Sequence, residues 1–220
     1  TDTYLDAVID NNPSEVKLSP TVRFTENGQR LEIGDGLWNT MKTKGSYMII
    51  VADVTAQQVV FMGTIAEDHR EADQETPALL ALRLRLENGV ISEIEHYVAR
   101  DAGAAARVAA LTPRAEFTTA IPANARMSRA DLIITANKYF SGMQRNDGKG
   151  DYPFADNCHR IENGMTSTNA PVPEGQTRAD PATAATYSGQ WSCMEQFKSG
   201  LLYFVNRIRD RRYVAVDEER

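Results

Sequence analysis

Residues 77–100 read PALLALRLRLENGVISEIEHYVAR, and this stretch decides the fold. Apolar and polar residues alternate on both sides of Asn88-Gly89, a pattern typical of two half-buried strands. Asn-Gly between two alternating runs is the strongest short-range signal for a β-hairpin, because both residues readily adopt positive φ in a tight turn. The stretch therefore predicts antiparallel strands over residues 77–87 and 90–100.

Upstream segments predict further strands. Two apolar runs, residues 47–53 and 59–66, have the composition of core strands. Residues 68–76 are rich in charge and are expected to form a loop. Residues 22–26 and 31–33 flank Asn27-Gly28 and predict a shorter hairpin.

Two helices are expected in the same half of the chain. The first starts at Tyr4, carries its apolar residues on one face, and ends before Pro13. The second is expected over residues 37–44, with Asp35 as its cap and Gly45 at its end. The order helix, hairpin, helix and four antiparallel strands predicts an α+β domain with its helices on one face of a curved sheet.

The tripeptide Glu26-Asn27-Gly28 recurs as Glu162-Asn163-Gly164, 136 residues later (162 − 26). Each copy follows a short extended run, residues 157–161 in the second case, and an aromatic-led helical segment. Recurrence of these elements in one order indicates two copies of one domain. The alternative is chance, since a third Glu-Asn-Gly at residues 87–89 lacks this upstream context. We favour a repeat, with domains at residues 1–101 and 128–220.

Residues 102–127 are predicted to be a partly helical linker, because they are rich in alanine and contain two prolines. Ser128 is expected to cap the next helix with Asp131 near its third position. Residues 166–189 predict a long loop, which is commonly functional or mobile.

The end of the chain predicts a shortened second copy. A helix is expected over residues 191–202, and strands over residues 203–208 and 212–216. The first copy has two further long strands at this stage and the second has none. Either another chain completes the second sheet, or the natural protein continues beyond Arg220.

Composition excludes several classes of protein. A net charge of −6 argues against a general nucleic-acid binder. No apolar run approaches the ~20 residues of a membrane span, and no signal peptide is visible. A cytoplasmic location is favoured, with secretion as the alternative. Cys158 and Cys193 could form a disulfide or remain thiols, and we favour two buried thiols.

These features resemble the NTF2-like superfamily of cystatin-like α+β barrels, which includes the SnoaL-like proteins. The resemblance rests on residues 4–8 ahead of residues 22–24, and on the hairpin at residues 82–97. Residues 158–164 fit the pattern Cys-X-Arg-X-Glu-Asn-Gly found in the second copy of tandem forms. The resemblance implies two cone-shaped barrel repeats, the second incomplete at its C-terminus. It also implies a pocket between sheet and helices, frequent homodimers, and proton-transfer chemistry without a cofactor.

Three residues are candidates for catalysis. Tyr4 matches the position at which ketosteroid-isomerase-like relatives place an oxyanion donor, a role that suits a neutral phenol. Glu26 lies near the position of the carboxylate base, and an apolar pocket would raise its pKa. His96 has the titration range of a general acid–base. Each residue also has a non-catalytic alternative. Tyr4 could be a core tyrosine, Glu26 a structural glutamate in a turn, and His96 an exposed histidine on a strand.

Other residues are candidates for lining a substrate pocket, although core packing would explain the aromatic ones equally well. His159 and Arg160 are adjacent in a predicted strand, so only one of them can face a pocket. The three histidines, at 69, 96 and 159, lack metal-ligand spacing, so no metal and no cofactor is expected. The substrate-binding candidates are Trp38, Met48, Phe61, Tyr139, His159 and Arg160.

The sequence thus predicts a cofactor-independent lyase, isomerase or dehydratase for a small hydrophobic molecule, aromatic or polyketide-like. One version, drawn from the resemblance, is deformylation of a lignin-derived diarylpropane. The alternative is a non-catalytic module of the same fold for ligand binding or dimerisation.

Overall fold

The computed structural model describes residues 1–68 and 75–220, so the predicted charged loop, with His69, falls largely outside the described residues. The chain forms two compact units. The first contains residues 1–126 and 214–220, and the second contains residues 127–213. Each unit is described by itself below.

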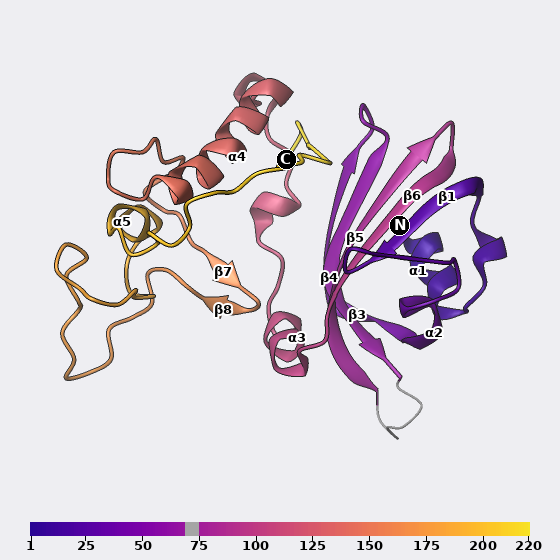
Figure 1. Ribbon diagram of the computed structural model, residues 1–220, viewed down its shortest axis with the longest axis horizontal. Coiled ribbons are helices and arrows are strands. Elements are labelled where there is room, and N and C mark those ends of the chain that lie inside the picture. The colour runs from indigo at the N-terminus through magenta and orange to yellow at the C-terminus, as the bar shows by residue number, and fades with distance from the viewer. Residues whose placement is uncertain (69–74) are drawn as a thin grey trace. The chain divides into compact units, whose positions relative to one another are not determined.

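The first unit is built on a six-stranded sheet (Figure 1). Its strands follow the spatial order β2-β1-β6-β5-β4-β3, and β3 to β6 are consecutive antiparallel neighbours. β1 joins β6 in parallel, with Glu26 opposite His96. The strands are β1 (Leu18–Glu26), β2 (Gln29–Leu31), β3 (Met41–Asp53), β4 (Gln58–Glu67), β5 (Thr76–Glu87) and β6 (Val90–Ala99).

The hairpin predicted around Asn88-Gly89 is confirmed, and its register decides which side chains face inward. Leu82 on β5 lies opposite His96 on β6, and Arg83 lies opposite Glu95. Because successive residues of a strand point to opposite faces, Leu82 and His96 share the inner face. Arg83 is buried on the other face, where it forms ion pairs with Glu93 and Glu95.

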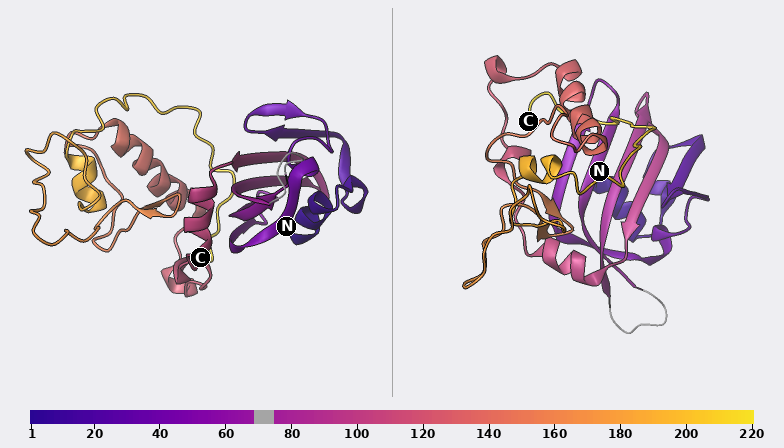
Figure 2. Two further views of the ribbon diagram at one scale, coloured as in Figure 1. Left: turned by 90° about the horizontal axis from the view of Figure 1, so that it is seen from below. Right: turned by 60° about the vertical axis from the view of Figure 1, so that its left-hand side comes forward.

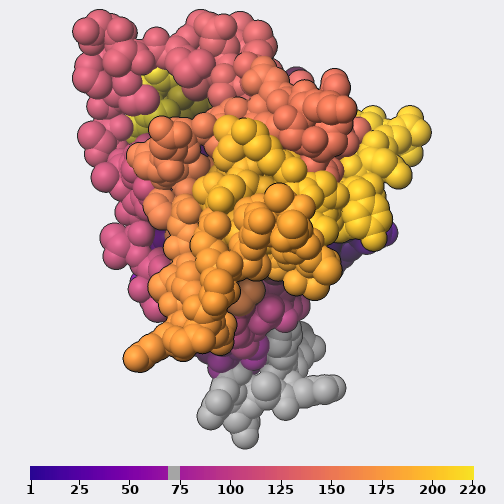
Figure 3. All heavy atoms as spheres, turned by 90° about the vertical axis from the view of Figure 1, so that its left-hand side faces the viewer, coloured from indigo at the N-terminus to yellow at the C-terminus, as the bar shows by residue number. Residues whose placement is uncertain are grey.

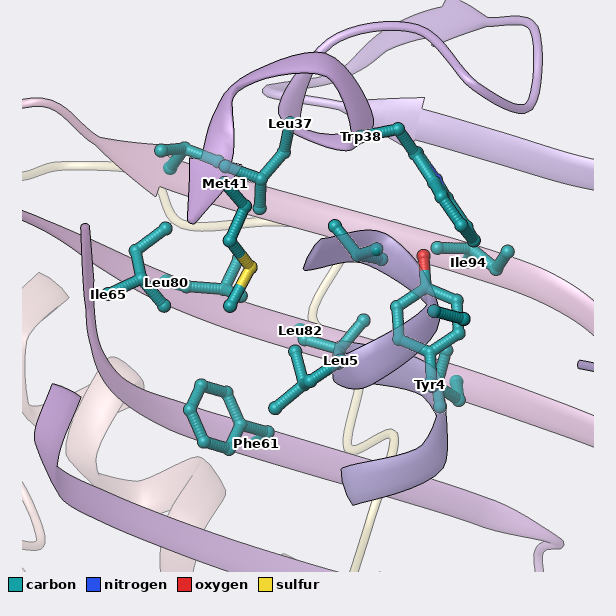
Figure 4. Packing of buried hydrophobic residues seen from close by; sticks show 14 of the residues in the cluster. Tyr4, Leu5, Leu37, Trp38, Met41, Phe61, Ile65, Leu80, Leu82 and Ile94 are labelled. Atoms are coloured by element: carbon teal, nitrogen blue, oxygen red, sulfur yellow. The ribbon is translucent and has the colours of Figure 1, made fainter. Parts of the chain in front are cut away.

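Two helices, α1 (Asp2–Ile9) and α2 (Leu37–Thr40), lie against the inner face of the curved sheet, with the 3₁₀ turn η1 (Pro13–Glu15) after α1 (Figures 1 and 2). Side chains from the helices and from β1, β3, β4, β5 and β6 form one apolar core (Figure 4). A large curved sheet with few helices agrees with the α+β fold that the NTF2-like resemblance implies. The largest fully buried side chains of this core include Tyr4, Leu5, Phe24, Leu37, Trp38, Met41, Phe61, Ile65, Leu80 and Leu82.

The opposite face of the sheet carries α3 (Ala102–Ala109), which contacts β3, β4 and β5. Asp101 caps α3 by accepting a hydrogen bond from the backbone of Ala104. The segment predicted as a partly helical linker therefore begins as part of the first unit. Two 3₁₀ turns follow, η2 (Ala115–Phe117) and η3 (Ala123–Ala125). The end of the chain returns to the first unit, since the Val216 amide donates to the carboxylate of Asp53.

The prediction of a helix over residues 37–44 is wrong in its extent. α2 ends at Thr40, and residues 41–53 form the long strand β3. Gly45 does not end a helix. It lies within β3, where an added Cβ would come within 2.1 Å of the Thr64 hydroxyl oxygen on β4. Close approach of the two strands explains glycine at this position.

The second unit has less regular structure. It consists of α4 (Arg129–Gln144), a hairpin of β7 (Ile161–Glu162) and β8 (Met165–Thr166), and α5 (Cys193–Lys198). Ser128 caps α4 through the Asp131 amide, as predicted. Residues 171–180, in the predicted long loop, are exposed throughout, and Figure 3 shows the loop on the surface.

Several predictions for the second unit are wrong. The helix expected over residues 191–202 is shorter and spans only α5, with Ser192 and Glu195 forming a capping box at its start. Residues 203–208 and 212–216, expected as strands, form no regular element, and the extended run at 157–161 contributes only Ile161 to a strand. These segments have apolar residues but no neighbouring strand to pair with, so local propensity is not enough to make a sheet.

Cys158 and Cys193 form a disulfide with Cα atoms 6.0 Å apart, so the preference for buried thiols is wrong. The bond joins the start of α5 to the segment ahead of β7. Two cysteines allow only one pairing, which was the stated alternative, but the sequence does not show whether the two sulfur atoms come close enough to bond.

All three Glu-Asn-Gly tripeptides form the same tight turn. Asn27, Asn88 and Asn163 have φ of 48°, 53° and 49°, and each following glycine also has positive φ. The turn therefore follows from the dipeptide itself. The order helix, hairpin, helix is common to both units, whereas the four long strands occur only in the first.

Candidate functional site

Three predicted catalytic residues meet between α1 and the sheet. The Tyr4 hydroxyl lies 2.9 Å from Nε2 of His96. On the other side of the imidazole, Nδ1 lies 3.9 Å from Oε2 of Glu26, an ion-pair distance longer than a hydrogen bond. The alternation that places Ile94 and Val98 in the core carries His96 inward with them, so His96 is not an exposed strand histidine.

Glu26 is held by two further groups. Its Oε2 accepts a hydrogen bond from the backbone amide of Leu37, at 2.8 Å, where α2 begins. Its Oε1 accepts a hydrogen bond from Arg100 at 3.0 Å. The residue before Leu37 is Gly36, which has φ of 60°. A Cβ added to Gly36 would lie 2.5 Å from Oε2 of Glu26. Glycine at this position therefore lets α2 approach the carboxylate.

The environment keeps Glu26 ionised. Burial alone would raise its pKa, but the imidazole of His96, the Leu37 amide and the Arg100 guanidinium together lower the pKa to about 2. The sequence-based expectation of a raised pKa is therefore wrong. Two hydrogen-bond donors and a nearby imidazole surround a carboxyl group that was expected to be in an apolar pocket.

The ionised carboxylate also decides how His96 holds its proton. Burial lowers the pKa of His96, although the Glu26 charge opposes this, so the imidazole is neutral at pH 7. Facing a carboxylate, the neutral ring favours its proton on Nδ1. Nε2 then carries the lone pair, and the Tyr4 hydroxyl donates to it.

Tyr4 itself stays a phenol. Burial raises its pKa well above the usual value, and the negative charge of Glu26 adds to this, while the indole of Trp38 acts in the opposite direction. The rings of Tyr4 and Trp38 meet edge to face, with centroids 5.5 Å apart. Nε1 of Trp38 is the indole group that lowers the pKa of Tyr4, so it lies near the Tyr4 hydroxyl, but it does not reach hydrogen-bond geometry with any described group.

Two members of the network were missed by sequence reasoning. Arg100 donates from one nitrogen to Oε1 of Glu26 and, at 2.9 Å, to Oε1 of Glu67. Glu67 is buried at the end of β4 and also accepts a hydrogen bond from the Thr40 hydroxyl. Glu67 directly follows an apolar run, and this position was the sequence signal that could have marked it as a buried carboxylate. No local pattern reveals that Arg100 bridges two carboxylates from different strands.

The predicted substrate-binding residues of the first unit are not members of this hydrogen-bond network. Trp38 adjoins it and Phe61 packs in the apolar core, both 1% exposed. Met48 is 39% exposed on β3. A surface groove of about 500 Å³ lies elsewhere, beside β1 and β2. It is lined by Pro20, Thr21, Val22, Arg30, Leu31, Glu32 and Ile33.

The remaining predicted residues belong to the second unit. Arg160 donates hydrogen bonds to Tyr187 and Gln196 and forms an ion pair with Glu162. His159 is exposed, so of these two neighbours Arg160 faces inward. Tyr139 packs against Phe154 and Phe197. This is a separate cluster from the one around His96.

Among residues 1–68 and 75–220, no group of three or more His, Cys, Asp or Glu side chains is arranged to hold a metal ion. In the same part of the chain, no helix is long and apolar enough to cross a membrane.

Comparison with known proteins gives one family match. Residues 125–220 match the family described as Domain of unknown function (DUF8021). No curated protein matches the chain.

Solved structures show limited similarity. AclR, a suggested hydroxylase from Streptomyces galilaeus, is 15% identical with a TM-score of 0.37, covering 61% of this chain and 90% of its own. An NTF2-like protein from Burkholderia thailandensis is 15% identical with a TM-score of 0.35, covering 46% and 87%. AusH from Aspergillus nidulans is 13% identical with a TM-score of 0.36, covering 53% and 90%.

Proposed function

We propose that the first unit is a cofactor-independent acid–base enzyme, a lyase, isomerase or dehydratase, for a small hydrophobic molecule. The single observation that carries the proposal is the sequence of contacts Tyr4–His96–Glu26 in an apolar interior. A hydroxyl, an imidazole and an orienting carboxylate in this order can move a proton without a metal or a cofactor.

The arrangement assigns a role to each residue. Glu26 stays ionised and orients the imidazole, so it is a positioning residue and not the base. His96 is the proton acceptor because its Nε2 carries a lone pair inside the protein. Tyr4 lies between His96 and the ligand. An aromatic or polyketide-like carbonyl compound fits the surroundings, which include the rings of Phe24 and Trp38.

Access to this site requires movement. Tyr4 and His96 are at most 2% exposed and Glu26 is 8% exposed. A ligand can therefore reach them only if α1 or α2 moves away from the sheet. α2 has only four residues, and a single backbone hydrogen bond, from Leu37, ties its start to Glu26. Leu37 and Trp38 are also buried in the core, and the Thr40 hydroxyl donates to Glu67, so a movement of α2 must break these contacts as well. Because α2 is the shorter of the two helices, it is the element that we expect to move.

The test is turnover of a panel of aryl and polyketide-like carbonyl compounds after dialysis against a chelator. His96→Gln keeps a polar side chain of similar size but removes the basic imidazole. It should lower turnover about 10²–10⁴-fold while the protein still folds. Turnover that is lost on chelation, or unchanged in His96→Gln, would contradict the proposal.

A second candidate is a non-catalytic module for ligand binding or dimerisation, and a specific observation favours it. Trp38, Met41, Phe61 and Leu82 fill the space between helices and sheet where a substrate pocket is expected (Figure 4). In that case the Tyr4–His96–Glu26 network only stabilises the fold, and the groove beside β1 and β2 is the binding surface. Ligand binding lost in Arg30→Ala but retained in His96→Gln, without any turnover, would favour the module.

We also propose that the second unit is a shortened copy of the first and that the protein forms homodimers. The shared order of helix, Asn-Gly hairpin and helix supports the first part. Glu162 does not repeat the environment of Glu26, since it is exposed and pairs with Arg160. Roles for Tyr139, His159 and Arg160 towards the same ligand stay a prediction. Sedimentation equilibrium tests the dimer, and a monomer at all concentrations would contradict it.

A further inference from the structure

Most hydrogen-bond donors around His96 already have a protein acceptor. The proton of Tyr4 is directed at Nε2 of His96. The Leu37 amide and the Arg100 guanidinium both point to Glu26. None of these groups is therefore free to donate to an oxygen of a bound molecule. Nδ1 of His96 also lacks a hydrogen-bond partner among the described residues, but it faces the Glu26 carboxylate at 3.9 Å.

The indole N–H of Trp38 is different. Trp38 is 1% exposed, and its Nε1 has no hydrogen-bond partner among the described residues. The Tyr4 hydroxyl points towards α2, beside Trp38 and Ile94 (Figure 4). A buried N–H without an acceptor costs stability, and such groups are uncommon in folded proteins. The chain's other tryptophan, Trp191, follows the usual pattern, since its Nε1 donates to the carbonyl of Ala179 at 2.8 Å.

We propose that Trp38 Nε1–H is the oxyanion donor of the site, and that it binds the oxygen of an enolisable carbonyl compound. The inference rests on the proposed function and changes the role of Tyr4. The sequence suggests Tyr4 as the donor to this oxygen. The geometry instead makes Tyr4 the group that receives the ligand's proton and Trp38 the group that stabilises the resulting negative charge.

The proton transfer balances within these residues. The ligand's C–H bond breaks as its proton passes to the Tyr4 oxygen, while the Tyr4 proton passes to Nε2 of His96. The electron pair left by the proton moves into the carbonyl and gives an enolate, whose oxygen accepts from Trp38 Nε1–H. The imidazolium that forms faces the Glu26 carboxylate at 3.9 Å. Return of the proton to another carbon completes an isomerisation.

The surroundings strengthen this assignment. The ring of Phe24 packs against His96 with centroids 5.0 Å apart, and Ile94 is fully buried. Hydrogen bonds to a developing anion are stronger where water is excluded. The indole N–H is also carried by α2, the short element expected to move when a ligand binds, so binding and closure would bring the donor to the oxygen together.

The test uses nitrophenols of decreasing pKa as probes, because each presents a single phenolate oxygen on a small aromatic ring. Indole N–H resonances are observed in ¹⁵N-labelled full-length protein, where Trp38 and Trp191 give one signal each. We expect phenolate binding to move the Trp38 signal downfield and leave the Trp191 signal in place. Trp38→Phe keeps an aromatic ring without the N–H and should weaken phenolate binding about 10- to 100-fold. Trp191→Phe is the matched control and should bind phenolates as the wild type does.

Three results would overturn the inference. They are phenolate binding that leaves the Trp38 signal unchanged, equal affinity in Trp38→Phe, and no phenolate binding at all. The wild-type NMR result does not depend on whether Trp38→Phe folds. Turnover separates this inference from the proposed function. If a substrate is turned over with full rate in Trp38→Phe, the donor assignment fails and the enzyme proposal stands. If phenolates bind through Trp38 but His96→Gln affects no reaction, the enzyme proposal fails and the oxygen-binding site stands.

Discussion

The hydroxyl of Tyr4 and Nε2 of His96 lie 2.9 Å apart, although 92 residues separate them in the sequence. This contact joins α1 to the centre of the sheet and connects a buried phenol to a buried imidazole. Because Glu26 favours the imidazole proton on the far nitrogen, the phenol is the donor in the contact. The hydrogen bond therefore contributes both to the docking of α1 and to the proton path of the proposed enzyme.

Tyr4→Phe tests this relationship. The ring and its packing remain, but Nε2 of His96 loses its partner inside the core. We expect a loss of about 1–3 kcal/mol in the free energy of unfolding, since a buried acceptor without a partner costs that much. The proposed reaction should slow by about 10²–10⁴-fold, the range found when a group that transfers the proton is removed. Urea unfolding and turnover provide the two measurements.

Tyr97→Phe is the matched control for Tyr4→Phe. Tyr97 lies next to His96 on β6 but is 53% exposed, on the opposite face of the sheet. Its hydroxyl can exchange a protein contact for water, so the change in stability should stay within about 0.5 kcal/mol. Equal losses in the two variants would show that the Tyr4–His96 contact contributes nothing specific.

The stability of the first unit should fall as the pH falls, in two windows. The pKa of His96 is lowered by burial, so its contribution is present above about pH 6.5, the pKa of an unfolded histidine, and decreases below it. Glu26 has a pKa of about 2, against 4.5 when unperturbed. Its contribution is present above pH 4.5 and is lost as the pH falls towards 2, by at most about 3 kcal/mol. Urea unfolding at several pH values between 7.5 and 2.5 measures both.

Glu26→Gln separates the two windows. The amide does not titrate, so the decrease between pH 4.5 and 2 should become shallower, while the decrease that starts near pH 6.5 remains. The variant should also be less stable than the wild type at pH 7, because Arg100 loses one of its two carboxylate partners. A wild-type acid profile that is unchanged in Glu26→Gln would mean that Glu26 is not held in its charged form.

The first unit could be predicted largely from sequence because its signals are local and repeated. The alternation around Asn88-Gly89 identified two strands and the turn that joins them, and Asn27-Gly28 identified the short hairpin. The register was not predicted, since an irregularity between Arg85 and Leu86 shifts it and places Leu82 opposite His96. The parallel pairing of β1 with β6 was not predicted, since no local pattern determines which distant strand completes a sheet. The helix predicted over residues 37–44 failed because pairing with β4 extends the strand β3 back to Met41.

The sequence named the candidate site residues one by one but not their arrangement. Tyr4, Glu26 and His96 were identified by type and position, and the structure brings them together. The ionisation of Glu26 could not be predicted, because Arg100 and the Leu37 amide reach it only through tertiary packing. The second unit was less predictable, since the Cys158–Cys193 disulfide replaces an extensive sheet as its constraint.

Removal of that disulfide should destabilise the second unit. Cys158 and Cys193 are 35 residues apart. Freeing a loop of this length in the unfolded chain corresponds to about 4 kcal/mol at 25 °C in the chain-entropy description. Reductant should therefore lower the melting temperature of the second unit. This melting is monitored by the fluorescence of Trp191 in a Trp38→Phe variant. The melting of the first unit is monitored by the fluorescence of Trp38 in a Trp191→Phe variant. Its melting temperature should be the same with and without reductant.

The double variant Cys158→Ser, Cys193→Ser is the control for reduction. It should melt at the temperature of the reduced wild type and show no response to reductant. A second unit whose melting is the same with and without reductant would show that the aromatic cluster around Phe197 is sufficient to hold it.

Gly36→Ala should disturb Glu26 more than a backbone change alone would. Gly36 has φ of 60°, and a Cβ at this position would lie 2.5 Å from Oε2 of Glu26 and 2.9 Å from a methyl carbon of Leu31. Gly28→Ala is the matched control, since its φ is 81° and a Cβ there meets no heavy atom within 4 Å. Both variants carry the strain of a positive φ, about 1–2 kcal/mol. Only Gly36→Ala must also move the carboxylate from the Leu37 amide, which adds about 1–3 kcal/mol.

The acid profile identifies the cause of any difference between these two variants. Displacing Glu26 from its donors raises its pKa towards 4.5, so Gly36→Ala should flatten the stability profile between pH 4.5 and 2. Gly28→Ala should lose stability by a similar amount at every pH and keep the wild-type slope. Urea unfolding of both variants at pH 7 and pH 3 is sufficient for the comparison. Equal losses with equal slopes would mean that the Glu26 carboxylate does not need the close approach of α2, and the positioning role assigned to Glu26 would then be wrong.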